Sequence, residues 1–168
     1  MIVSQLRKYK SKLKLNKLVK AGLTIGKGCR IMTKFKFTEP YLITIGDYVS
    51  IGTGVQIIPH DGAVWTLRHL KNNLKIDRFG KIKIGSNVFV GNNAIILPDT
   101  VIGDNIIIGA NSIVRGVLEA NSVYAGVPVK RVCSIEEYYL KYESRFLNTK
   151  GLNPEMKKEI ILKNHDKI

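Results

Sequence analysis

The stretch that decides the fold is residues 84–114, IGSNVFVGNNAIILPDTVIGDNIIIGANSIV, where an aliphatic residue returns at every sixth position. Glycine follows most of these aliphatic residues, which are Ile84, Val90, Ile96, Ile102, Ile108 and Val114. A period of six is too short for a repeat built from helices and is typical of a parallel β-helix. Three hexads are expected to form one triangular coil, with the aliphatic side chain inward and the glycine turning a corner that often needs a positive φ. Small or β-branched residues four places further on are expected to complete the core; they are Val49, Val55, Val88, Ala94, Thr100 and Ser112.

The period is interrupted twice before residue 84. The first interruption adds two residues between Ile25 and Ile45, so the segment 34–41 is expected to bulge. The second adds three residues to a multiple of six, and it predicts that residues 59–81 leave the solenoid as a loop. Loops that leave a rigid scaffold commonly carry catalytic residues.

Helices are expected at both ends of the solenoid. Residues 3–20 place Leu6, Tyr9 and Leu13 on one stripe among lysines, which predicts a basic amphipathic helix. This helix either caps the first coil or contacts an anionic membrane surface. Further helices are expected from Ser134 to Leu147, which opens with a helix-start signature, and from Asn153-Pro154 to about Lys163. The expected division is a basic cap (1–22), the β-helix (23–132) and a helical extension (133–168).

The composition predicts a soluble, cytoplasmic protein. The net charge is +14, and the first 38 residues carry eleven Lys or Arg and no acid. Such a charge attracts anions in general and selects neither nucleic acid, membrane nor phosphorylated cofactor. Two cysteines are too few for a disulfide framework, and no apolar run approaches the length of a membrane span. No nucleic-acid partner is expected, because no recognised binding module is present.

Among the three histidines, His60 has the most informative position, at the start of the expected loop between Pro59 and Asp61. Histidine serves as a general base near neutral pH, but a lone histidine is often structural. Spacing by itself leaves both roles open.

Two segments together resemble the hexapeptide-repeat acyltransferases: PHDG at residues 59–62 before the loop, and the run 84–132 that ends in AGVPVKRV. Within that superfamily the chain most resembles the small sugar O-acetyltransferases of the galactoside, maltose and capsule or O-antigen type. The resemblance covers about residues 25–135. It implies a left-handed β-helix, acetyl-CoA as co-substrate without a metal, a homotrimer with active sites between subunits, and a sugar acceptor in surface-polysaccharide assembly. An association with the inner face of the membrane is left open.

The resemblance also implies roles for individual residues. His60 would take the proton from the acceptor hydroxyl, and the backbone amide of Asn92 would stabilise the oxyanion. The cofactor would be held by Asn92, Ala110, Arg115, Gly116, Lys130 and Arg131, with Asn92 and Ala110 stacked one coil above the other. The candidate acceptor contacts are Asp61, Trp65 and Arg68.

Alternatives stay open for the acceptor side. Asp61 would orient His60, bind a sugar hydroxyl or only form a turn, and Trp65 would stack on a sugar or anchor the loop on the solenoid. Relatives that act on simple galactosides carry an asparagine where this chain has Met32-Thr33-Lys34-Phe35, which argues against such acceptors. An antibiotic acetyltransferase and a non-catalytic scaffold are the alternative functions. A γ-class carbonic anhydrase is not expected, because three histidines that converge on zinc are not available.

Overall fold

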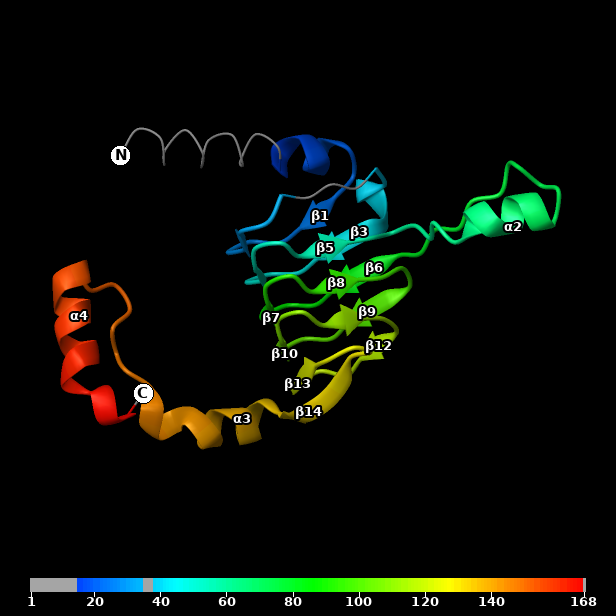
Figure 1. Ribbon diagram of the computed structural model, residues 1–168. Helices are drawn as coiled ribbons and strands as arrows, with labels where there is room; N and C mark the ends of the chain where they lie inside the picture. The colour runs from blue at the N-terminus through cyan, green and yellow to red at the C-terminus, as the bar shows by residue number, and fades with distance from the viewer. Residues whose placement is uncertain (1–14, 35–37, 168) are drawn as a thin grey trace.

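The structure is a computed structural model that describes residues 15–34 and 38–167. It shows a triangular solenoid of short strands, a loop that projects from it and a C-terminal helical arm (Figure 1). Three sheets form the sides, with strand orders β1-β3-β6-β9-β12, β14-β13-β10-β7-β4-β2 and β11-β8-β5. Successive strands lie on successive sheets and pair in parallel with the coil before, except that β14 pairs antiparallel with β13. The predicted left-handed parallel β-helix is confirmed.

The strands are short because each hexad provides one side of the triangle. The first sheet contains β1 (Thr24–Ile25), β3 (Ile43–Ile45), β6 (Ile82–Ile84), β9 (Thr100–Ile102) and β12 (Val117–Leu118). The second contains β2 (Arg30–Ile31), β4 (Ser50–Ile51), β7 (Val88–Val90), β10 (Ile106–Ile108), β13 (Ser122–Ala125) and β14 (Lys130–Ser134). The third contains β5 (Gln56–Ile57), β8 (Ile95–Ile96) and β11 (Ile113–Val114). The first corner joins the first sheet to the second, the second corner joins the second to the third, and the third corner returns to the first.

The core consists of layers of inward-facing side chains. The aliphatic residues of the six-residue period from Ile45 to Val114 are buried, and so are the predicted small or β-branched positions from Val49 to Ser112. The buried hydroxyls of Thr100 and Ser112 donate to the carbonyl oxygens of Leu97 and Gly109, at 2.6 and 2.8 Å. Each buried polar group in these layers therefore has a partner, as a packed interior requires.

The expected reason for glycine after the aliphatic residue, a positive φ, is wrong. Gly46, Gly85 and Gly91 do not have a positive φ; the positive values come two residues later, for example at Asn87 (54°) and Asn93 (58°). Glycine is required for close approach, because a Cβ on Gly85 would lie 2.7 Å from the carbonyl carbon of Gly103 in the next coil. Asparagine occupies the left-handed positions because its short side chain tolerates them better than most.

The predicted loop at residues 59–81 is confirmed, and it contains a helix that the sequence did not indicate, α2 (Val64–Leu70). Figure 1 shows α2 projecting away from the solenoid. The neck of the loop is narrow, because His60 forms an antiparallel bridge with Phe79 and the Gly80 amide donates to the Pro59 carbonyl at 2.8 Å. This neck holds His60 at the third corner.

At the N-terminal end, residues 15–20 are helical, and Leu15 and Leu18 pack against the core of the first coil. This packing supports the interpretation of a cap. The remainder of the predicted helix, with Leu6, Tyr9 and Leu13, lies outside the described residues, as does Phe35. No helix in the described part of the chain is long and apolar enough to cross a membrane.

At the C-terminal end, the chain turns back after β13, and β14 pairs antiparallel with β13. The two predicted helices are confirmed as α3 (Ile135–Tyr142) and α4 (Pro154–Lys163), although α3 gives way early to a 3-10 turn, η2 (Glu143–Arg145). Ser134 and Glu137 form a capping box at α3, and Asn153 caps α4. Two more 3-10 turns are η1 (Pro40–Leu42), before β3, and η3 (His165–Lys167), near the C-terminus.

Candidate active site

His60 and Glu39 form a pair at the third corner. Glu39 immediately precedes η1, at the end of the first coil, and its Oε2 lies 3.1 Å from Nδ1 of His60. The side chain of Glu39 is 13% exposed, whereas the ring of His60 is 47% exposed. When Nδ1 donates to the carboxylate, Nε2 carries the free lone pair and can accept a proton. Glu39 was not predicted from the sequence; the only signal for it is the bulge at 34–41, one coil before His60.

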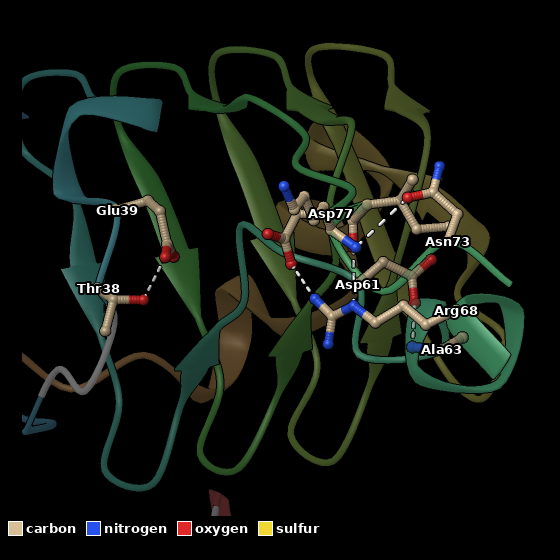
Figure 2. Close-up of polar contacts among 9 residues, drawn as sticks. Thr38, Glu39, Asp61, Ala63, Arg68, Asn73 and Asp77 are labelled. Carbon is tan, nitrogen blue, oxygen red and sulfur yellow. Dashed lines mark hydrogen bonds and ion pairs between the residues drawn. The ribbon is translucent and has the colours of Figure 1, made fainter.

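The carboxylate of Glu39 is ionised at neutral pH. Burial acts to raise its pKa, but the hydroxyl of Thr38 and the ring of His60 both donate to the carboxylate. Together they hold the pKa of Glu39 below its ordinary value of 4.5. Figure 2 shows the Thr38 hydroxyl directed at Glu39. The imidazole thus has a permanent anionic partner.

Asp61 has different partners. Its Oδ1 accepts from the Ala63 amide at 3.0 Å, and its Oδ2 accepts from Arg78 Nη1 at 2.9 Å. The Ala63 amide first, and then the charges of Arg78 and Arg115, hold the pKa of Asp61 below its ordinary value. The interpretation that Asp61 orients His60 is therefore wrong, because Glu39 holds Nδ1. Arg78 also contacts Asp99 Oδ2 at 2.7 Å and so ties the loop neck to the next coil.

A groove of about 430 Å³ opens beside His60, with Trp65 and Phe79 among the residues that line it. Trp65 is 67% exposed, and its ring contacts His69 with 5.3 Å between centroids. The alternative that Trp65 anchors the loop on the solenoid is wrong. Arg68 donates to the carbonyl of Ile76 at 2.8 Å and pairs with Asp77, so it shapes the loop (Figure 2). Its contact with an acceptor stays a prediction.

Asn92 and Ala110 lie at the second corner. The Asn111 amide donates to the carbonyl oxygen of Asn92 at 2.9 Å, so Ala110 is stacked on Asn92 as expected. Asn92 is exposed, and its Oδ1 accepts from the Thr53 amide at 3.0 Å. Within residues 15–34 and 38–167, no acceptor is found for the backbone N–H of Asn92.

The remaining predicted cofactor residues divide between the two edges of the third sheet. Lys130 pairs with Ala125 at the second corner, and Arg131 Nε donates to Ser122 Oγ at 3.1 Å. Arg115 and Gly116 follow β11 at the third corner, on the side of His60. Asn92 does not line the groove beside His60. One chain thus places the predicted base and the predicted oxyanion donor at opposite edges of the same sheet.

Comparisons with known proteins agree with this architecture. The family model "Bacterial transferase hexapeptide (six repeats)" matches residues 81–116. The chain is 44% identical to Protein CapG of Staphylococcus aureus over 160 residues, which cover 94% of this chain and 92% of CapG.

Sugar acetyltransferases are also similar to the solenoid part. Galactoside O-acetyltransferase of Escherichia coli is 36% identical over 71% of this chain and 61% of that enzyme. The crystal structure of a maltose O-acetyltransferase from Clostridium difficile matches with a TM-score of 0.58 and 30% identity, over 67% of this chain and 59% of that one. The chain thus spans about three fifths of these two enzymes and nearly all of CapG. With the repeat, the solenoid and this relative in agreement, the chain belongs to the hexapeptide-repeat acyltransferase family and is an enzyme of that family.

Proposed function

We propose that this enzyme is an acetyl-CoA-dependent O-acetyltransferase that transfers an acetyl group to a sugar hydroxyl, with His60 as the general base. The observation that carries the proposal is the pair of His60 and Glu39 at the open groove, which leaves Nε2 free to accept a proton. The similarity to galactoside and maltose O-acetyltransferases supports the choice of a sugar.

The chemistry needs a base because a sugar hydroxyl does not ionise at neutral pH. Nε2 takes the hydroxyl proton while the oxygen attacks the thioester carbonyl carbon, and a tetrahedral oxyanion forms. The oxyanion collapses, the carbon–sulfur bond breaks, and the leaving thiolate takes the proton back from the imidazolium. Glu39 favours this sequence because its negative charge stabilises the imidazolium that forms between the two proton transfers.

The oxyanion donor in this proposal is the backbone N–H of Asn92, which has no acceptor in the described part of the chain. Because His60 and Asn92 lie at opposite edges of the third sheet, we propose a homotrimer in which His60 of one subunit faces Asn92 of the next. Ala110 and the cationic pair Lys130 and Arg131 follow Asn92 along the same corner, where they would bind the pantetheine arm and the phosphates of the cofactor. Arg115 and Gly116 would contact the cofactor from the facing edge.

The acceptor would lie in the groove beside His60. Trp65 and Phe79 are 67% and 49% exposed there, and such aromatic surfaces suit the apolar face of a pyranose. Asp61 would accept from a sugar hydroxyl, and Arg68 would contact the acceptor from α2. The proposal includes a role in the cytoplasmic assembly of surface polysaccharide. This part rests on the resemblance of the sequence to capsule or O-antigen acetyltransferases.

The test is the release of free CoA from acetyl-CoA by purified wild-type protein, with nucleotide sugars, free sugars, serine and chloramphenicol as acceptors. We expect release that depends on a sugar and disappears in His60→Ala. His165→Ala is the matched control, because His165 lies in η3, outside the groove, and should keep full activity. Absence of release with every acceptor, together with no CoA binding by calorimetry, would reject the enzyme mechanism and favour a scaffold.

A further inference from the structure

At two corners of the solenoid, backbone amides donate hydrogen bonds to side-chain oxygens of the next coil. At the first corner, the N–H groups of Lys27, Asp47 and Ser86 donate to side-chain oxygens of Asp47, Ser86 and Asp104 at 2.8, 3.1 and 2.6 Å. At the second corner, the Thr53 amide donates to Asn92 Oδ1 at 3.0 Å. In each case the acceptor belongs to the equivalent residue one coil further on. A polar side chain at this position therefore satisfies the amide of the coil before it.

This series of hydrogen bonds from backbone amides to side chains of the next coil ends at Asn92. The equivalent residue one coil further on is Ala110, and the two are in close register, because a Cβ on Gly91 would lie 2.5 Å from the Ala110 nitrogen. A methyl group cannot accept a hydrogen bond. Asn92 is an exposed residue, and its amide thus has no acceptor among the residues that the structure describes.

We propose that the methyl side chain of Ala110, which cannot accept a hydrogen bond, leaves the N–H of Asn92 free to donate to the oxyanion of the acyl transfer. Ala110 is then a positioning residue that acts through Asn92, because its side chain offers no hydrogen-bond acceptor to the Asn92 N–H. A hydroxyl or carboxylate at position 110 would occupy the N–H in the resting enzyme, and the oxyanion would have to displace it. This inference rests on the proposed acetyltransferase function.

The decisive variants are Ala110→Thr and Ala110→Val, which have nearly the same shape and differ in one hydroxyl. In Ala110→Thr the oxyanion must displace a hydrogen bond of about 1 kcal/mol, so we expect kcat of Ala110→Thr to lie about fivefold below that of Ala110→Val. Ala120→Thr is the matched control. Ala120 is the equivalent residue beyond Asp104 at the first corner, where the Asn121 amide donates to the Asp104 carbonyl at 3.0 Å. We expect this variant to keep wild-type activity.

Amide hydrogen exchange supplies a readout that does not depend on catalysis. In the wild type, the Asn92 amide should exchange faster than the Thr53 and Ser86 amides, which have acceptors. A net hydrogen bond of about 1 kcal/mol in Ala110→Thr should slow exchange at Asn92 by about fivefold, and Ala110→Val should leave it unchanged.

Two results would overturn the inference. One is a wild-type Asn92 amide that exchanges as slowly as that of Thr53. The other is an equal loss of kcat in Ala110→Thr and Ala110→Val, which would mean that bulk matters and the hydroxyl does not. Failure of the proposed function would be recognised separately, because the wild type would then release no CoA with any acceptor.

Discussion

Replacement of Glu39 by glutamine tests whether the carboxylate supports the base. The change keeps the shape of the side chain and removes a charge 3.1 Å from Nδ1 of His60. A hydrogen bond to a charged group contributes about 1.5–3 kcal/mol. The carboxylate is largely buried, but the ring is 47% exposed, so water competes for it and the lower end of this range, about 1.5 kcal/mol, applies.

The loss should fall on the chemical step. The imidazole becomes positively charged only as it takes the acceptor proton, so the charge of Glu39 stabilises the transition state more than the ground state. With about 1.4 kcal/mol for each factor of ten, the lost charge lowers kcat about tenfold. The glutamine NH₂ group can also donate to Nδ1, which places the proton on Nε2 and blocks the base. We therefore expect a loss of about 10-fold to 100-fold.

The assay is initial-rate thiol release with saturating acceptor, in Glu39→Gln and in Glu143→Gln. Glu143 also accepts a hydrogen bond, from the Tyr139 hydroxyl at 3.0 Å, but it lies in the C-terminal arm. We expect kcat to fall only in Glu39→Gln, with KM for the acyl donor unchanged. An unchanged kcat in Glu39→Gln would refute the argument that the carboxylate acts through His60.

Three further outcomes are expected. Gly85→Ala should lower the free energy of unfolding by about 1–3 kcal/mol in urea titrations, because its Cβ would meet the backbone of Gly103 at 2.7 Å, whereas Gly62→Ala, with nothing within 4 Å, should change it little; equal effects would contradict the close-approach explanation. The pKa of Glu39 lies below 4.5 in the folded state, so its stabilising contribution is present above about pH 4.5 and is lost as the pH falls through the folded pKa. The difference in the free energy of unfolding between wild type and Glu39→Gln should therefore shrink in acid. A difference that grows in acid would contradict a lowered pKa for Glu39. Trp65→Ala should raise KM for the sugar and leave KM for the acyl donor unchanged, because Trp65 lines the groove from an exposed position; the reverse pattern would assign Trp65 to the cofactor.

Several features could be predicted from the sequence because they depend on local or periodic geometry. Each coil repeats the same three strands, so a six-residue period identified the inward-facing residues without knowledge of any contact. The starts of α3 and α4 were predictable because Ser134 with Glu137, and Asn153 with Pro154, act within one helical turn. The resemblance of 59–62 and 84–132 to known acyltransferases identified His60 and Asn92 as candidates.

Other features depend on how coils stack, and only the tertiary structure could decide them. Glu39 lies in the bulge at 34–41 and His60 in the loop at 59–81, and both segments interrupt the period, so no repeat arithmetic could align the two residues. The repeat glycines were assigned the wrong reason because the distance to the next coil is a property of packed strands and not of one hexad. The open amide of Asn92 likewise depends on Ala110 one coil away. The sequence by itself determined the fold and named the candidate base His60, whereas stacking between coils determined that Glu39 contacts His60 and that the Asn92 amide has no acceptor in the described part of the chain.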